Sequence, residues 1–161
     1  MSRQDCIIVK GTWLENMKEV CFVNVYAEQS VTKRIDLWNF ISNALANCNG
    51  SVCVFGDFNE VRKSYERRGS AYDERGANEL NNFIQINNLE DLKIGGKAFT
   101  WSNKSGSKAS RLDRILISKE GGFWDENIEV IAESRTGIKT GRPDFPLSFH
   151  SNYGGPEPSN L

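Results

Sequence analysis

Apolar residues in the first third of the chain alternate between strand-like and helix-like spacing. Cys6–Val9 and Val20–Tyr26 are apolar and β-branched, and a short polar connection separates them, which predicts two adjacent antiparallel strands. Over Val31–Ala46, apolar residues recur every three or four positions, which predicts a helix that lies on a sheet, with Ser30 as a candidate cap. Ser51–Phe55 is a continuous apolar run, typical of a strand buried on both faces.

The remainder of the chain predicts a second helix and further strands. Helical spacing resumes over Ala77–Asn88, after an arginine-rich polar loop that we expect to be long and exposed. Strands are predicted over Arg111–Ser118 and Ile128–Ile131. The segment 135–161 loses periodicity as Gly, Pro and Ser accumulate, which indicates an irregular or disordered tail. We therefore expect one α/β domain over residues 1–134, followed by this tail.

Composition and charge exclude several classes of protein. With 161 residues, of which 39% are apolar and 25% charged, the chain is suited to one globular domain and not to a disordered or fibrous protein. A formal net charge of −1 argues against binding of nucleic acid through bulk charge, although a local basic groove stays possible. Because the sequence shows neither a secretory signal nor a membrane span, we expect an intracellular protein, nuclear or cytoplasmic.

The cysteines do not follow a metal-binding pattern. Cys6, Cys21, Cys48 and Cys53 lack paired C-x-x-C spacing, and the single histidine, His150, is distant in the sequence. We therefore expect no zinc site. Most of the cysteines lie in apolar runs, so reduced, buried thiols are favoured over disulfides.

The end of the buried run at Ser51–Phe55 carries the first candidate chemistry. Gly56 is followed by Asp57 and Asn59, which flank Phe58. In an extended strand exit, residues two apart project to the same side, so the carboxylate and the amide are expected to face one site while Phe58 turns inward. Together they can bind a water and direct its lone pair. A plain turn role for Asp57 is the alternative.

A second group of charges stands where the strand predicted over 111–118 begins. Arg111, Asp113 and Arg114 precede an otherwise core-like run, and buried charges cost free energy unless they are paired or used. Asp113 therefore has either a functional role or a structural one, in an ion pair with Arg111 or Arg114.

In their order along the chain, four motifs resemble the endonuclease/exonuclease/phosphatase family. They are "VNVYAEQ", "VFGDFNEVR", "FTWSN" and "SRLDRILIS". The resemblance runs from about residue 6 to residue 131 and is strongest to the endonuclease domain of plant LINE-type, non-LTR retrotransposons. It implies a partial two-sheet α/β sandwich that hydrolyses phosphodiesters, with DNA as the partner and Mg²⁺ as the cofactor.

The resemblance also implies a role for each matched position. Asp57 would polarise or deprotonate the attacking water, and Asn59 would orient that water or hold a phosphate oxygen. Asp113 would fix and charge a catalytic histidine. Tyr26 would reach a phosphate oxygen, and Trp101 would lie beside the scissile site. For both aromatic residues, core packing is the alternative.

Positive charge near these positions supplies the predicted contacts to DNA. The arginine-rich loop follows the candidate site directly, and arginine is well suited to phosphate. The predicted nucleic-acid contacts are Arg62, Arg67, Arg68, Trp101 and Arg111. Acidic residues dilute the charge of the loop, so a solvated mixed-charge loop is the alternative.

The chain departs from the family pattern at both ends. It starts after the strand that delivers an asparagine and the segment that brings the metal-binding glutamate, so we expect an N-terminally truncated domain with impaired Mg²⁺ binding. At the other end, "GRPDFPLSFH" takes the place of a Ser-Asp-His motif, which leaves Asp144 as the metal-ligand candidate there and no catalytic histidine. We therefore expect a catalytically impaired phosphodiesterase of retroelement origin. The alternative is a non-catalytic module that keeps the fold and binds nucleic acid or protein. The sequence does not indicate an oligomeric state.

Overall fold

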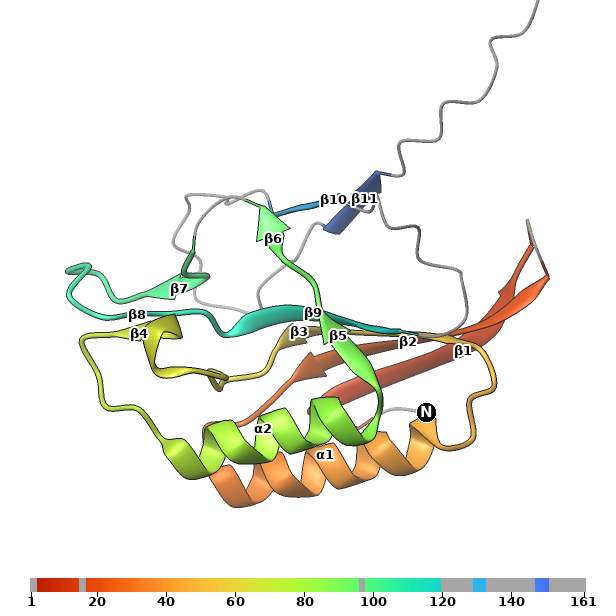
Figure 1. Ribbon diagram of the computed structural model, residues 1–161, viewed down its shortest axis with the longest axis horizontal. Coiled ribbons are helices and arrows are strands. Elements are labelled where there is room, and N and C mark those ends of the chain that lie inside the picture. Colours follow the sequence, from red (N-terminus) through yellow and green to blue (C-terminus); the bar gives the residue numbers. More distant parts are fainter. Residues whose placement is uncertain (1–2, 15–16, 96–97, 120–128, 133–146, 151–161) are drawn as a thin grey trace, which may run out of the picture.

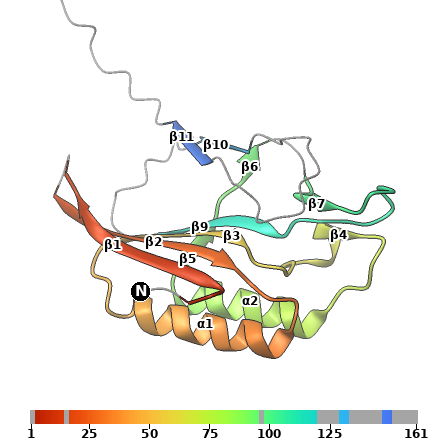
Figure 2. The same cartoon turned by 180° about the vertical axis from the view of Figure 1, so that it is seen from behind.

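The computed structural model describes residues 3–14, 17–95, 98–119, 129–132 and 147–150. Within them, five strands form a central sheet in the order β1–β2–β3–β9–β5, and two helices cover one face of it (Figures 1 and 2). The strands of this sheet are β1 (Cys6–Trp13), β2 (Lys18–Tyr26), β3 (Ser51–Asp57), β5 (Leu89–Asp91) and β9 (Asp113–Ser118). The helices are α1 (Val31–Leu45) and α2 (Glu74–Ile86), with a short 3-10 helix, η1 (Ser64–Glu66), between β3 and α2.

Two small sheets accompany the central one. The first has the order β4–β8–β7, with β4 (Arg67–Arg68), β7 (Trp101–Ser102) and β8 (Ala109–Ser110), and it lies beyond the end of β3 (Figure 1). The second has the order β11–β10–β6, with β6 (Ile94–Gly95), β10 (Glu129–Ala132) and β11 (Leu147–His150). The predicted mixed α/β class with more than one sheet is thereby confirmed.

Strand β11 lies within the segment 135–161, for which the sequence indicates no periodicity, and it pairs antiparallel with β10. The other residues of that segment, Asp144 among them, lie outside the described residues.

Strand pairing fixes the relative positions of the candidate residues. β1 pairs antiparallel with β2, β2 pairs parallel with β3, and β3 pairs antiparallel with β9. Helix α1 makes the crossover that a parallel β2–β3 pair requires. In the resulting register, Tyr26 lies beside Asp57, and Asp57 lies opposite Asp113. Three motifs that are distant in the sequence therefore meet at one end of the sheet.

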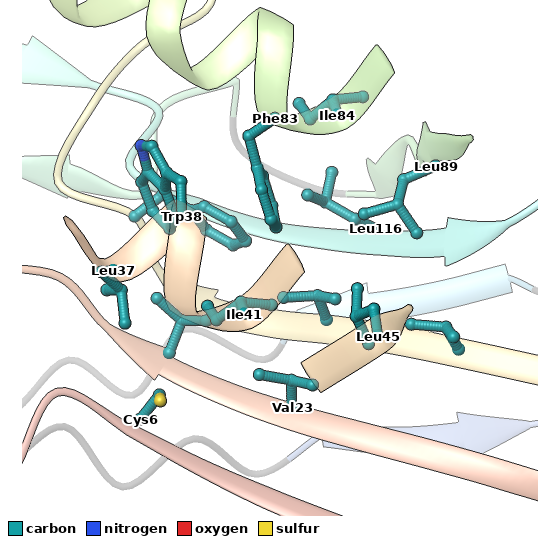
Figure 3. Packing of buried hydrophobic residues seen from close by; sticks show 14 of the residues in the cluster. Cys6, Val23, Leu37, Trp38, Ile41, Leu45, Phe83, Ile84, Leu89 and Leu116 are labelled. Atoms are coloured by element: carbon teal, nitrogen blue, oxygen red, sulfur yellow. The ribbon is translucent and has the colours of Figure 1, made fainter. Parts of the chain in front are cut away.

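The core lies between the central sheet and the helices. Trp38 of α1 stacks on Phe83 of α2, with ring centroids 5.0 Å apart (Figure 3). Trp38 also stacks on Phe58, with ring centroids 5.5 Å apart. Such aromatic pairs are each worth about 0.5–1.5 kcal/mol beyond the burial of their area. The sheet adds alternate residues such as Val23, which is fully buried. Phe58 is fully buried as well, so the prediction that it turns inward is confirmed.

The observed helices and strands differ from the predicted ones mainly in the residues at which they begin and end. β1 continues to Trp13, and β9 begins at Asp113. Helix α2 begins at Glu74, earlier than predicted, because the Asp73 carboxylate accepts a hydrogen bond from the N–H of Gly76 and caps the helix. Among the described residues, neither helix is long and apolar enough to cross a membrane.

Candidate functional site

A cavity of about 500 Å³ opens where β2 and β3 end. Five of the predicted residues line it, so the structure brings them together: Tyr26, Asp57, Asn59, Arg67 and Trp101. Tyr26 and Trp101 are 53% and 45% exposed, which is too open for core packing. A larger cavity, of about 860 Å³, lies near the amino end of β3 at Ser51 and contains none of the predicted site residues.

The backbone of β3 brings Asp57 to the cavity through an unusual residue. Gly56 has φ +128°, and a Cβ there would overlap the carbonyl oxygen of Val25 on the neighbouring strand β2. Only glycine avoids that overlap and adopts this backbone conformation without strain. The glycine that ends the apolar run therefore has a steric reason, since it allows β3 to lie close against β2 immediately before the carboxylate.

Asn59 holds the strand exit in place. Its backbone N–H donates to Oδ1 of Asp57 at 2.8 Å, and its side-chain Nδ2 donates to the carbonyl of Ala27 at 2.8 Å. Asn59 has φ +51°, a left-handed conformation that asparagine tolerates better than most residues. Asp57 and Asn59 reach the same cavity as predicted, but this left-handed turn places them there, not the alternation of an extended strand.

Asp57 and Asp113 are carboxylates on neighbouring strands, and the pKa of each is raised above its usual value. Burial raises the pKa of Asp57, and the N–H of Asn59 partly opposes that effect. Burial also raises the pKa of Asp113, to about 6; the Asp57 charge adds to the rise, while a hydrogen bond with Thr100 and the Arg114 charge oppose it. Asp57 lines the cavity, where a carboxyl with a perturbed pKa is typical of a functional site, whereas Asp113 lies opposite it on β9 and is not among the residues that line the cavity.

The arginines that flank Asp113 bind other carboxylates. Arg114, whose side chain is fully buried, contacts Glu66 at 2.5 Å and Asp91 at 2.7 Å. Arg111 contacts Asp91 at 3.0 Å and Glu66 at 3.4 Å. The structural alternative, in which Asp113 pairs with one of these arginines, is therefore not the arrangement found.

The arginine-rich loop is more ordered than the exposed segment predicted. Glu66 is only 8% exposed, and its carboxylate accepts the backbone N–H of Arg62 at 2.7 Å. The Arg62 side chain binds Asn81 at 2.8 Å and Asp91 at 3.0 Å. Arg62 and Arg111, two of the predicted DNA contacts, therefore belong to one partly buried ion-pair cluster with Arg114, Glu66 and Asp91.

The other two predicted arginines differ in position. Arg67 lines the cavity and donates to Glu60 at 3.4 Å and to the carbonyl of Ala71 at 3.2 Å. Arg68 is exposed, and its guanidinium lies over the ring of Phe99. Arg68 and Trp101 are thus the predicted contacts that are most accessible to a large ligand.

Sequence reasoning missed a buried ion pair behind the cavity. Arg34 of α1 binds Glu60 at 2.6 Å, and their side chains are 5% and 2% exposed. Arg34 also donates to the carbonyl of Gln29, so it ties the segment after β2 to the segment after β3. The available signal was a charged residue on the apolar face of the helix, where Arg34 precedes Leu37 and Trp38.

The implied magnesium finds no complete site in the part of the chain that the structure describes. There, no group of three acidic, histidine or cysteine side chains lies close enough to hold a metal ion. The candidate ligand Asp144 lies outside the described residues, as does the side chain of His150. The described residues therefore offer no site of three or more such ligands, whereas Mg²⁺ in proteins is commonly held by one or two carboxylates together with waters and substrate oxygens.

Comparison with known proteins gives a fold. No family model and no curated protein matches the chain. Among solved structures, the endonuclease domain of TRAS1, a telomere-specific non-LTR retrotransposon, is 18% identical with a TM-score of 0.51, covering 71% of this chain and 51% of that one. A 3′ phosphatase from Neisseria bound to a product DNA hairpin is 15% identical with a TM-score of 0.56, covering 76% and 56%.

A beta toxin variant from Staphylococcus aureus with bound magnesium ions is 15% identical with a TM-score of 0.54, covering 81% of this chain and 47% of that one. The fold is of the endonuclease/exonuclease/phosphatase type. This chain spans about half the length of the solved chains that it matches. At these identities the similarity establishes the fold, whereas activity depends on the site itself.

Proposed function

We propose that this chain is an endonuclease-like domain of a plant LINE-type retroelement, that its substrate class is the DNA phosphodiester, and that its catalytic activity as this chain is low. One observation carries the proposal: Asp57, Asn59 and Tyr26 converge on a single cavity, and Asp113 lies directly opposite Asp57. The similarity to a retrotransposon endonuclease domain and to a DNA-bound phosphatase supports the choice of substrate.

The proposed reaction is attack of water on phosphorus. Asp57 accepts a proton from the water, and the raised pKa of its carboxyl makes it a better base than an exposed aspartate. As the new oxygen–phosphorus bond forms, the bond to the leaving alcohol oxygen breaks, and that oxygen takes a proton from solvent. Asn59, fixed at Ala27 through its Nδ2, orients the water, and the exposed Tyr26 hydroxyl donates to a phosphate oxygen.

The positively charged groups that line the cavity are the reason to propose low activity. Charge that develops on the phosphoryl group must be stabilised for fast cleavage, and a metal ion or an imidazolium usually supplies much of that stabilisation. The described part of the cavity presents two arginines, Arg34 and Arg67, but both bind the buried carboxylate of Glu60. Both guanidinium groups are therefore already bound before a phosphate arrives, and Glu60 offsets one of their two positive charges.

Nicking of supercoiled plasmid by the purified chain with Mg²⁺ tests this proposal. We expect cleavage close to background in the wild-type chain and in Asp57→Ala. The matched control is Asp36→Ala, which removes an exposed carboxylate from α1. Rapid nicking that Asp57→Ala abolishes and Asp36→Ala preserves would contradict low activity and support Asp57 as the base. Nicking that survives Asp57→Ala would contradict the assigned site.

The second candidate is a non-catalytic module that binds nucleic acid. The exposure of Arg68 and Trp101 beside the cavity favours it, because an accessible guanidinium and an aromatic face both suit nucleic acid. Fluorescence anisotropy with a labelled duplex separates the candidates. DNA affinity that falls with salt and with the double change Arg67→Ala/Arg68→Ala, in the absence of nicking, supports this candidate. Absence of DNA binding contradicts both candidates.

A further inference from the structure

The segment that leads into β3 contains an asparagine followed directly by a glycine, Asn49–Gly50, and the chain has this pair at no other position. Asn49 lies between helix α1 and strand β3, outside both elements, and is exposed. Gly50 comes directly before Ser51, the first residue of β3. Both residues of the pair line the larger cavity, of about 860 Å³, so they are open to water.

The side-chain amide of Asn49 is not held in place by the described part of the chain. Among the described residues, none donates a hydrogen bond to this side chain or accepts one from it. Asn103, which also lies outside helices and strands, is different. Its Nδ2 donates to the hydroxyls of Ser105 and Ser107 at 3.0 Å, and its Oδ1 accepts the backbone N–H of Lys108 at 2.9 Å. The Asn49 amide can therefore rotate toward the main chain at little cost, whereas the Asn103 amide would lose three hydrogen bonds.

The glycine at position 50 has a steric reason. A Cβ there would overlap the backbone carbonyl oxygen of Glu19 on β2. The close approach of β2 to the chain ahead of β3 thus requires glycine. Because Gly50 has no side chain, its backbone nitrogen is also left unshielded next to the Asn49 amide. The residue that the fold needs here is therefore also the one that least hinders attack by this nitrogen.

We propose that Asn49 is a site of spontaneous deamidation, at which the backbone nitrogen of Gly50 attacks Cγ of Asn49. The attack is intramolecular, between adjacent residues. The new bond from the nitrogen to Cγ closes a succinimide ring, while the bond from Cγ to Nδ2 breaks. Nδ2 leaves as ammonia and takes the proton of the attacking nitrogen. Water then opens the ring at either of its two carbonyl groups, to give aspartate or isoaspartate.

Isoaspartate at position 49 would displace the start of β3. In this product the main chain runs through the former side chain, which adds one carbon atom directly ahead of Gly50. At that point the chain already lies close against the backbone of Glu19. β3 pairs with β2 from Ser51 onward and carries Asp57 at its other end. We therefore expect the isoaspartyl form to be less stable than the original chain.

Mass spectrometry tests the proposal on the whole purified chain, incubated for several days at mildly alkaline pH and then digested. The peptide that contains residue 49 should convert to a mixture of isoaspartate and aspartate. The rate should lie within about tenfold of that in the same chain unfolded in urea, because an exposed segment with few contacts has little protection. Asn49→Gln should block the conversion, since glutamine would have to close a larger ring, and Asn103 should stay intact in the folded chain. Conversion of Asn49 only in the unfolded chain would overturn the proposal.

Thermal unfolding of the isoaspartyl form, separated by anion exchange, tests the effect on β3. Its unfolding midpoint should be lower than that of the fresh chain by about 2–4 °C or more. Asn49→Asp is the matched control, because it adds the same charge to an ordinary main chain, and its midpoint should stay close to that of the fresh chain. An isoaspartyl form with an unchanged midpoint, or an equal loss in Asn49→Asp, would refute the effect on β3. Because neither experiment involves DNA or Mg²⁺, both results are independent of the proposed function.

Discussion

Asp57 and Asp113 lie directly opposite each other on the antiparallel strands β3 and β9. Burial raises the pKa of both carboxyls, and that of Asp113 reaches about 6. Between the ordinary pKa of an aspartate and this raised value, the folded chain binds more protons at Asp113 than the unfolded chain does. The free energy of unfolding therefore falls as the pH rises from about 4 to about 6, and stays lower above that range.

Asp113→Asn should therefore stabilise the chain at pH 7 and have a smaller effect at pH 4.5. Asparagine carries no charge at either pH, so the penalty of ionising a buried group beside Asp57 disappears. We expect a gain on the order of 1–2 kcal/mol at pH 7, measured by urea unfolding at both pH values. Glu90→Gln removes an exposed carboxylate from β5 as the control. An equal effect of Asp113→Asn at the two pH values would contradict a raised pKa at Asp113.

Gly76→Ala should destabilise the chain despite its place in a helix. On propensity alone, alanine in α2 would stabilise by up to about 1 kcal/mol. A Cβ at this position, however, would overlap Oε2 of Glu60 and lie 2.9 Å from Nη2 of Arg34. Because both groups are buried and bound to each other, we expect a net loss on the order of 2 kcal/mol or more in thermal unfolding.

The control for that change is Asn78→Ala, on the exposed side of the same helix, which should be neutral or stabilising. If Gly76→Ala proved as stable as Asn78→Ala, the close approach of α2 to the Arg34–Glu60 pair would be refuted.

Glu66→Gln should be among the more costly single changes. It leaves Arg62, Arg111 and Arg114 around one remaining carboxylate, Asp91, in a partly buried cluster. Removal of one partner from a buried ion pair typically costs about 3–5 kcal/mol. Glu28→Gln breaks the exposed pair with Lys33 and should cost less than about 1 kcal/mol. Similar unfolding midpoints for the two variants would show that the cluster contributes little.

Arg68→Ala and Arg62→Ala should separate binding from folding. Arg68 is exposed, so its loss should weaken DNA affinity and lower its salt dependence without changing the unfolding midpoint. Arg62 binds Asn81 and Asp91, so its loss should lower the unfolding midpoint. Fluorescence anisotropy and thermal unfolding of both variants decide the matter. Equal DNA affinities for Arg68→Ala and the wild-type chain would remove Arg68 from the interface.

Most elements of the central sheet, and the antiparallel pairing of its first two strands, could be predicted because periodicity and β-branched runs depend on near neighbours in the sequence. The pairing of Cys6–Trp13 with Lys18–Tyr26, helix α1 and the buried strand β3 all follow from such local patterns. The meeting of Tyr26, Asp57 and Asn59 at one cavity follows in turn from parallel pairing of β2 with β3.

What could not be predicted depends on contacts between distant residues. Arg114 contacts Glu66, 48 residues away, and Asp91, 23 residues away, and no local pattern identifies those partners. The sequence shows that Arg62 and Arg111 are charged but not that carboxylates already bind them. The early start of α2, by contrast, could have been predicted from the sequence. Asp73 directly precedes the helical run and is a recognisable N-cap residue.

Ala27 is bound by the segment after β3 at both of its backbone groups, since its N–H donates to the carbonyl of Asp57 and its carbonyl accepts Nδ2 of Asn59. The segments that follow β2 and β3 are therefore tied together before any ligand binds. A ligand would meet a rim of the cavity that is already ordered. Affinity at this rim would consequently be gained with little loss of chain entropy.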